Sequence, residues 1–172
     1  MEIKKIKVGS LEANCYILIK NKDCIIIDPG AEIDKITPSL KGLNIVGVII
    51  THYHFDHIGC LSYFKNLNVP IYDYSNLSGI NEINDFKFYK IDTKGHHNTC
   101  ITIYFKDENI MFTGDFLFKN SIGRTDLEGG NASEMLKSIS LIKTYSPLIK
   151  VYPGHGVDTT LKNEFLNNIY FK

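Results

Sequence analysis

The chain has 172 residues, 44% of them hydrophobic, and its 19 lysines and arginines balance its 19 aspartates and glutamates. This length predicts a single domain over residues 1–172, with a core large enough to fold without disulfide or metal staples. A net charge of zero provides no basic surface for nucleic acid or an anionic membrane, and no apolar run approaches the roughly 18 residues of a membrane span.

The N-terminus and the cysteines predict a cytoplasmic protein. Charged and apolar residues alternate over residues 1–7, a pattern typical of a strand and not of a signal peptide. The four cysteines show no C-x-x-C spacing and lie mostly in apolar stretches. We interpret them as small buried hydrophobic residues with reduced thiols.

Short apolar runs separated by turn residues predict strands in the first third of the chain. We expect strands at 3–8, 15–19, 24–28 and 46–51, with a helix at 32–41. The first three strands are joined by short turns, which predicts an antiparallel meander. The fourth delivers the chain directly into a histidine-rich segment.

The later elements also alternate between strands and helices. Asn131 is followed three residues later by Glu134, which is the capping-box pattern and predicts a helix from there to about residue 145. Each half of the chain holds several strands followed by helices, which predicts an α/β (α+β) fold of two sheets packed face to face with helices outside. The other expected elements are helices at 58–65 and 160–169, strands at 69–73, 87–91 and 149–152, and a hairpin of 100–105 with 109–113.

Three short motifs contain all six histidines. The first reads T-H-Y-H-F-D-H over 51–57, and the others are G-H-H at 95–97 and P-G-H-G at 153–156. A lone histidine at a strand end is usually an ordinary surface or core residue. Four ligand-type residues at H-x-H-x-D-H spacing reverse that expectation, because such a cluster needs a divalent cation to organise it.

The spacing predicts two metal ions and divides the ligands between them. Residues two apart in an extended segment point the same way, so His52 and His54 are expected to bind one ion. Two-metal hydrolases hold their ions about 3.5–4 Å apart, and a carboxylate at a strand end is the natural bridge. We expect His52, His54 and His96 on one ion, Asp56, His57 and His155 on the other, and Asp115 on both. Seven ligands exceed the needs of one ion, unless some of them only support the others.

Zinc is the expected metal, and iron or manganese would suit the same ligands. Asp28 ends a strand and is expected to accept a hydrogen bond from a ligand histidine and fix its tautomer. Arg124 is the only arginine in the chain, which indicates a site where the guanidinium fork matters. His96 and His97 cannot both be ligands, because neighbouring side chains diverge, so His97 is left as a loop residue.

The order of these motifs resembles the metallo-β-lactamase superfamily over residues 28–155: H-x-H-x-D-H, Gly-His at 95–96, Thr-Gly-Asp at 113–115 and Gly-His at 154–155. The resemblance implies a four-layer αββα sandwich with the metals at one edge between the sheets. Asn-Cys-Tyr at 14–16, G-D-F-L-F at 114–118, G-R-T-D at 123–126 and G-H-G-V-D-T-T at 154–160 are similar to the short bacterial-type members of the glyoxalase II branch. Those members lack the C-terminal helical domain of the longer enzymes.

The resemblance implies hydrolysis of S-lactoylglutathione or a related acyl thioester. Arg124 matches a basic position that contacts glutathione in the longer enzymes, which implies that it binds a substrate carboxylate. Two departures from the branch are visible. Val157 replaces a tyrosine, and the middle motif lacks two prolines and a glycine while Lys94 places a positive charge beside it.

The predicted reaction is attack by a metal-activated hydroxide on a small-molecule thioester, with Asp115 and Asp56 as the catalytic carboxylates. A thiolate whose parent pKa is about 8.5 leaves without prior protonation, whereas an amine or alkoxide would need a proton from Asp56 or a metal-bound water. One alternative is a mononuclear iron persulfide dioxygenase that uses His52 or His54 with His96 and Asp115. Another is a metal-binding protein without turnover of its own.

Overall fold

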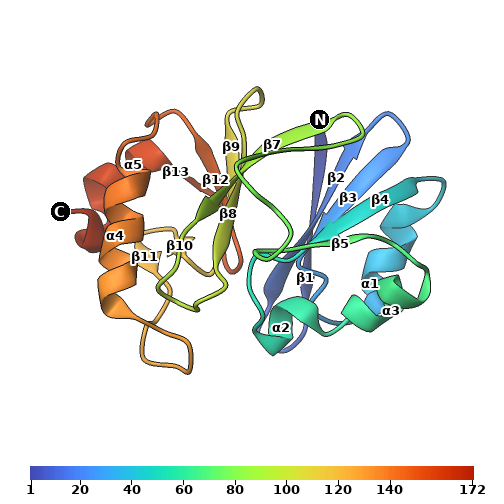
Figure 1. The fold of residues 1–172 in the computed structure, drawn as a ribbon, viewed down its shortest axis with the longest axis horizontal. Coiled ribbons are helices and arrows are strands. Elements are labelled where there is room, and N and C mark those ends of the chain that lie inside the picture. Colours follow the sequence, from blue (N-terminus) through green and yellow to red (C-terminus); the bar gives the residue numbers. More distant parts are fainter.

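Two β-sheets face each other and carry helices on their outer sides (Figure 1). The computed structural model describes residues 1–172. In the first sheet β1 to β3 form an antiparallel meander, and β4 and β5 add in parallel. Its strands, in spatial order, are β1 (Glu2–Val8), β2 (Ala13–Lys20), β3 (Asp23–Ile27), β4 (Asn44–Ile49) and β5 (Ile71–Tyr72).

The second sheet is antiparallel except where β9 and β12 run side by side in parallel. Its strands, in spatial order, are β13 (Thr159–Thr160), β12 (Lys150–Pro153), β9 (Ile110–Gly114), β8 (Ile101–Phe105), β7 (Phe86–Asp92) and β6 (Ile80–Ile83). A small separate ribbon pairs β10 (Leu117–Phe118) with β11 (Ser121–Ile122). The carboxyl ends of parallel neighbours meet at one edge, so residues that follow β3 and β4, or β9 and β12, are brought together there.

The helices divide between the two outer faces, as Figure 1 shows. The first sheet carries α1 (Ile33–Ile36), the 3-10 helix η1 (Thr37–Leu40), α2 (Phe55–Ile58) and α3 (Leu61–Asn66), and the second carries α4 (Ala132–Ile142), α5 (Leu161–Asn167) and the 3-10 helix η2 (Ile169–Phe171). The longest, α4, has 11 residues, and no helix combines the length and apolar character needed to cross a bilayer.

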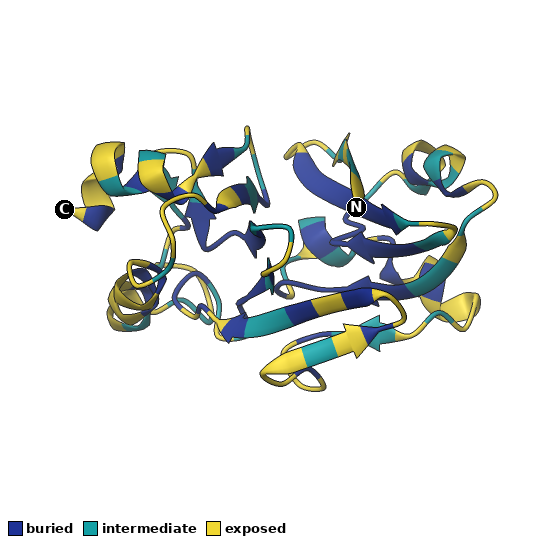
Figure 2. Cartoon of the chain, turned by 90° about the horizontal axis from the view of Figure 1, so that it is seen from above, coloured by how far each residue is buried: buried dark blue, intermediate teal, exposed yellow.

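Successive side chains of the central strands point to opposite faces and pack into separate apolar cores, of which there are three. In β2, Cys15 and Ile17 pack toward the helices of the first half, while Tyr16 and Leu18 pack between the sheets. A third core joins the second sheet to α4 and α5. Both faces of β2 are therefore buried, and Figure 2 shows such central strands in dark blue. This arrangement confirms the four-layer αββα sandwich.

Several local predictions are confirmed and others are wrong. Asn131 caps α4, with its side chain accepting from Glu134 N at 3.1 Å, and all four cysteines are free and buried. The helix expected at 32–41 is wrong as one element, because Pro38, which lacks an N–H, lies in the first turn of a separate 3-10 helix that begins at Thr37. The helix expected at 58–65 is two short helices that divide at Gly59 and Cys60. The short strands β6, β10, β11 and β13 were not predicted.

Candidate metal centre

The histidine motif leaves β4 in extended conformation and turns into α2 directly after His54, its second ligand-type residue. His54 is still extended, with φ −72° and ψ 147°, and α2 begins at Phe55. The turn closes with a bond from His57 N to His54 O of 3.0 Å. This change of backbone sends His52 and His54 one way and the residues of α2 another.

A first group consists of His52, His54 and His96, whose candidate ligand atoms all lie within 4.8 Å of one another. His54 Nδ1 lies 2.8 Å from His96 Nε2. Two ring nitrogens at this distance either share a proton or face a common cation. The G-H-H loop after β7 therefore brings His96 to the end of β4.

A second group consists of Asp56, His57 and His155, again with candidate ligand atoms within 4.8 Å. His155 Nε2 lies 3.2 Å from Asp56 Oδ2 and 3.4 Å from His57 Nε2. His57 Nε2 lies 3.7 Å from Asp56 Oδ2. Here α2 of the first half meets the loop after β12 of the second half.

Asp115 follows β9 and lies between the two groups. Its Oδ2 is 3.6 Å from His96 Nε2 and 3.9 Å from His52 Nε2, both in the first group. Toward the second group, Oδ2 is 3.5 Å from His155 Nε2, and Oδ1 is 3.3 Å from His57 Nε2 without hydrogen-bond geometry. One carboxylate therefore faces four imidazoles.

Hydrogen bonds at Nδ1 turn the Nε2 atoms of four histidines toward this centre. His57 Nδ1 donates to Asp28 Oδ2 at 2.9 Å, His96 Nδ1 to the Arg124 carbonyl at 2.8 Å, and His155 Nδ1 to the Leu11 carbonyl at 3.0 Å. A carbonyl or carboxylate only accepts, so each Nδ1 carries the proton. In its neutral form, each ring then presents an Nε2 lone pair to the centre, as a metal ligand must.

His52 follows the same logic through Thr51. The Thr51 hydroxyl donates to Asp28 Oδ2 at 2.6 Å, so it accepts from His52 Nδ1 at 3.1 Å. The remaining atom, His52 Nε2, is buried without any hydrogen-bond partner, and so is Asp115 Oδ1. Buried polar atoms are almost always partnered, and a cation between these two would satisfy both. The donor set therefore fits divalent ions.

Asp28 lies beside the centre, although it also approaches His52 and His57 closely enough to count as a third candidate group. Its carboxylate is 2% exposed and accepts three bonds, from Thr51 N at 2.8 Å, from the Thr51 hydroxyl and from His57. These donors occupy both oxygens. Asp28 therefore orients His57 and holds the motif loop in place.

The charges within the centre are strongly coupled. Burial lowers the pKa of His57, but the carboxylates of Asp28 and Asp115 outweigh it and raise the pKa to about 10. Burial likewise opposes the charge on His155, and Asp115 and Asp56 raise its pKa to about 9. Burial and the neighbouring His57 hold the pKa of His52 well below its usual range. Without a metal, His57 and His155 are thus both positively charged at neutral pH, each with a proton on both ring nitrogens.

The remaining candidate residues lie outside the two groups. His97 Nδ1 pairs with the Thr99 hydroxyl at 2.7 Å, although its ring stands 5.1 Å from that of His54. Lys94 lines a different hollow, beside Glu134 on α4. The Arg124 guanidinium is exposed and forms two 2.7 Å bonds with Asp126.

The sequence reasoning missed three supports of the centre. Two are the backbone carbonyls of Leu11 and Arg124, which accept from His155 and His96 and leave no signal in residue type. The third is Gly154, where an added Cβ would lie 2.1 Å from Asp115 Oδ1. A histidine between two glycines was noticed, but the close approach that requires the first glycine is visible only in the fold.

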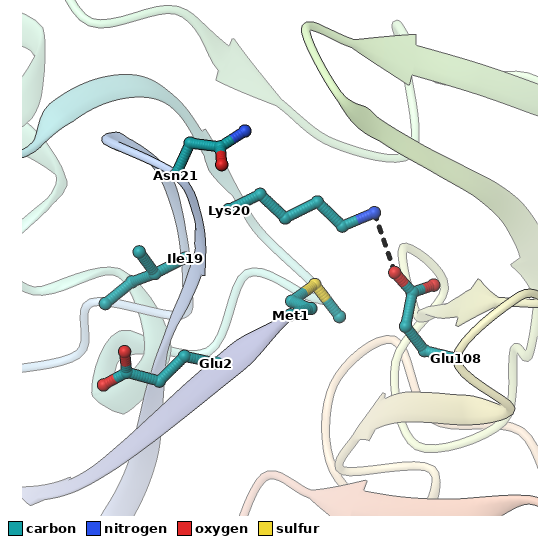
Figure 3. A pocket seen from close by; sticks show the side chains of 6 residues that line it. All are labelled: Met1, Glu2, Ile19, Lys20, Asn21 and Glu108. Atoms are coloured by element: carbon teal, nitrogen blue, oxygen red, sulfur yellow. Dashed lines mark ion pairs between the residues drawn. The ribbon is translucent and has the colours of Figure 1, made fainter.

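Two hollows differ in their chemistry. The larger, of about 550 Å³, lies where β3 and β9 begin, at the edge away from the histidines. Figure 3 shows its lining and the 2.7 Å ion pair between Lys20 and Glu108. It holds no group of metal-ligand side chains. The smaller, of about 400 Å³, opens directly onto both histidine groups and Asp115, so we take it as the functional hollow.

The family model of the metallo-beta-lactamase superfamily matches residues 8–75 and 75–155. The chain belongs to the metallo-beta-lactamase superfamily. A relative from Bacillus subtilis (strain 168), named probable metallo-hydrolase YqgX, is 32% identical over 97% of this chain and 98% of its own. The crystal structure of the BLEG-1 B3 metallo-beta-lactamase is 29% identical, covers 99% of both chains and superposes with a TM-score of 0.93.

Other similar proteins differ in their metal and in their named activity. The crystal structure of TTHA1623 in a di-iron-bound form is 25% identical, covers 97% of this chain and 99% of its own, and has a TM-score of 0.89. The hydroxyacylglutathione hydrolase GloC of Haemophilus influenzae is 27% identical over 98% of this chain and 99% of its own. Superfamily membership therefore indicates a metal-dependent hydrolase and leaves the metal and the substrate open.

Proposed function

We propose that this metallo-beta-lactamase superfamily member is a thioesterase that holds two divalent ions and cleaves S-lactoylglutathione or a related acyl thioester. The observation that carries the proposal is the set of four imidazole Nε2 atoms turned toward one carboxylate, Asp115, by hydrogen bonds at the opposite ring nitrogen. The full-length similarity to a hydroxyacylglutathione hydrolase supports the choice of thioesters.

The donor set divides as two ions require. His52, His54 and His96 would hold one ion, Asp56, His57 and His155 the other, and Asp115 would contact both. Zinc is the proposed metal, and iron or manganese would fit the same imidazoles and carboxylates. When bound, such a pair lowers the pKa of a coordinated water toward about 7 and so supplies hydroxide at neutral pH.

The chain's own residues orient this chemistry. Asp28 and the carbonyls of Leu11 and Arg124 hold a proton on Nδ1 of His57, His155 and His96, so that Nε2 of each ring would face a bound ion. Asp56 is taken up by the second group and is a poor proton donor to a leaving group. A thiolate leaves without a proton, because its parent pKa is only about 8.5. This favours thioesters over amides.

Arg124 is proposed to meet a carboxylate of the substrate. Its guanidinium borders the functional hollow but is already paired with Asp126. Both partners are exposed, so solvent screens their attraction and the pair contributes little to stability. A substrate carboxylate would therefore have to displace Asp126, at little cost.

Elemental analysis of the natively expressed protein combined with a thiol-release assay tests the proposal. We expect about two metal ions per chain and release of thiol from S-lactoylglutathione or from a panel of acyl thioesters. About one iron per chain, with oxygen consumption on glutathione persulfide, would replace the thioesterase with a dioxygenase. No turnover of any thioester, lactone or phosphoester by metal-replete protein would favour a metal-binding protein.

A further inference from the structure

Three large apolar side chains surround the entrance to the functional hollow. Leu11, Phe55 and Leu127 line it together with members of both histidine groups. They remain 52%, 73% and 42% exposed, respectively. Single exposed apolar residues are common on protein surfaces, but a convergent set around a polar centre indicates a binding site. We call these three residues the apolar rim.

The three residues of the apolar rim lie in segments that also contain or orient the candidate metal ligands. The Leu11 carbonyl accepts from His155 Nδ1, and Phe55 lies between His54 and Asp56 in the sequence. Leu127 follows Arg124 in the same loop, where Gly130 N closes a turn onto the Leu127 carbonyl at 2.9 Å. The backbone that carries each apolar side chain therefore lies beside the ligand histidines or the loop that supports them.

The functional hollow offers a substrate no unpaired lysine or arginine side chain. Arg124 is its only lysine or arginine, and both arms of the guanidinium fork are bound to Asp126 at 2.7 Å. A substrate with carboxylates near its thiol, such as a glutathione conjugate, would have to replace Asp126 on Arg124. Its gain in binding free energy is then only the difference between its own exposed ion pair with Arg124 and the pair that it displaces. An apolar acyl group instead gains from every methylene that it removes from water.

We propose that the apolar rim binds the acyl group of the thioester and that the preferred substrates carry an apolar acyl chain of medium length. This inference rests on the proposed thioesterase function and narrows its substrate class. The volume of about 400 Å³ lies near the lower end of small-molecule sites, which span about 300–1,000 Å³. Hydrolysis forms one C–O bond and breaks the C–S bond, whose electron pair leaves on sulfur. The products are a carboxylate and a thiol.

A chain-length series on an uncharged carrier tests the proposal. With N-acetylcysteamine thioesters from acetyl to octanoyl, we expect kcat/KM of the zinc-loaded enzyme to rise by up to about fourfold for each buried methylene. Phe55→Ser and Leu127→Ser should flatten this dependence, and Phe55→Leu should restore most of it. Leu148→Ser removes an equally exposed leucine, 74% exposed, that does not line the hollow, and it should keep the wild-type dependence.

A binding series separates the substrate class from the proposed reaction. Linear alkanethiols from ethanethiol to hexanethiol are added to cobalt-loaded protein, and the thiolate-to-cobalt absorption reports their affinity without turnover. Affinity should increase with chain length in wild type and Leu148→Ser and much less in Phe55→Ser. If no thioester is cleaved but this increase is present, the thioesterase proposal fails and the apolar site stands.

Three results would overturn the apolar rim as an acyl site. One is a flat chain-length dependence in wild-type protein, in hydrolysis and in thiol binding. Another is an equal dependence in Phe55→Ser, Leu127→Ser and Leu148→Ser. A kcat/KM for S-lactoylglutathione above that for octanoyl N-acetylcysteamine would likewise show that the carrier, and not the acyl chain, is recognised.

Discussion

Replacing Asp28 by asparagine is expected to reverse the tautomer of His57. Asp28 Oδ1 accepts from Thr51 N at 2.8 Å, and Oδ2 accepts from the Thr51 hydroxyl at 2.6 Å and from His57 Nδ1 at 2.9 Å. An asparagine that keeps its oxygen on Thr51 N presents its NH₂ to His57. The ring then accepts at Nδ1 and carries its proton on Nε2, where the metal would bind.

The size of the effect follows from the role of Asp28 as a support. Removing a hydrogen-bond partner of a metal-ligating histidine typically costs 10–100-fold in metal affinity, or about 1.4–2.8 kcal/mol. The loss should affect both groups. His57 belongs to the second, and the Thr51 hydroxyl, facing the new NH₂, would no longer donate to residue 28 and would stop accepting from His52 Nδ1 in the first. Chelator competition and isothermal titration calorimetry of the metal-free protein would resolve the two binding events.

Asp73→Asn is the matched control. Asp73 is 8% exposed and accepts from the Tyr53 hydroxyl and from Ser75 N and Oγ, so its loss disturbs a hydrogen-bonded aspartate that touches no ligand histidine. It should leave both metal affinities near wild type. Two unchanged affinities in Asp28→Asn, or equal losses in both variants, would refute the reasoning about the tautomer.

Three further outcomes are expected. The pKa values of His57 and His155 are about 10 and 9 without metal, so binding of metal at pH 7.5 should release about two protons from these rings. Calorimetry in buffers of different ionisation enthalpy measures this release, and a value near zero would contradict the charges assigned to the two histidines. The raised pKa of His57 contributes its full stabilisation of the metal-free fold below about pH 6.5, and this contribution is lost as the pH rises toward 10. Urea unfolding in the presence of a chelator should therefore show a lower free energy of unfolding at pH 8.5 than at pH 6.5. A higher free energy at pH 8.5 would contradict this assignment. Gly154→Ala places a Cβ 2.1 Å from Asp115 Oδ1 and should lower kcat/KM by about 100-fold. Gly42→Ala strains a residue with φ +75° but meets open space, so it should lower stability and retain activity; similar losses of activity in both would contradict the steric reasoning.

The layers and the approximate place of the site were predictable because the relevant signals are local. The continuous apolar run along residues 15–19 marks a strand that is buried on both faces, and β-branched runs that end in a ligand-type residue mark the strand ends that converge. Two-residue strands such as β13 were not predictable, since Thr159 and Thr160 pair only because β12 is already in place. Local propensity carries no information about such late partners.

The electrostatic details of the site were predictable only in part. The role of Asp28 as an acceptor could be inferred from its position at a strand end, and the structure places it on His57. The ion pair of Arg124 with Asp126 could not be inferred, since it depends on how the loop folds back on itself. Likewise, two carbonyl acceptors and the steric need for Gly154 arise from tertiary approach. The function of Arg124 toward a substrate stays a prediction.

The bond from His155 to the Leu11 carbonyl spans 144 positions of the chain and has a consequence for biogenesis. An isolated antiparallel bridge between Ala13 and His155 lies beside this bond. It also joins the first hairpin to the loop that carries the last ligand. Contacts this distant in sequence form late, because closing so long a loop costs entropy before any contact is gained. During synthesis, the first group and its shared carboxylate Asp115 can be supported only once residue 124 has emerged, because the Arg124 carbonyl orients His96. The second group must wait for residue 155, so capture of the second ion would report that the two sheets have already come together.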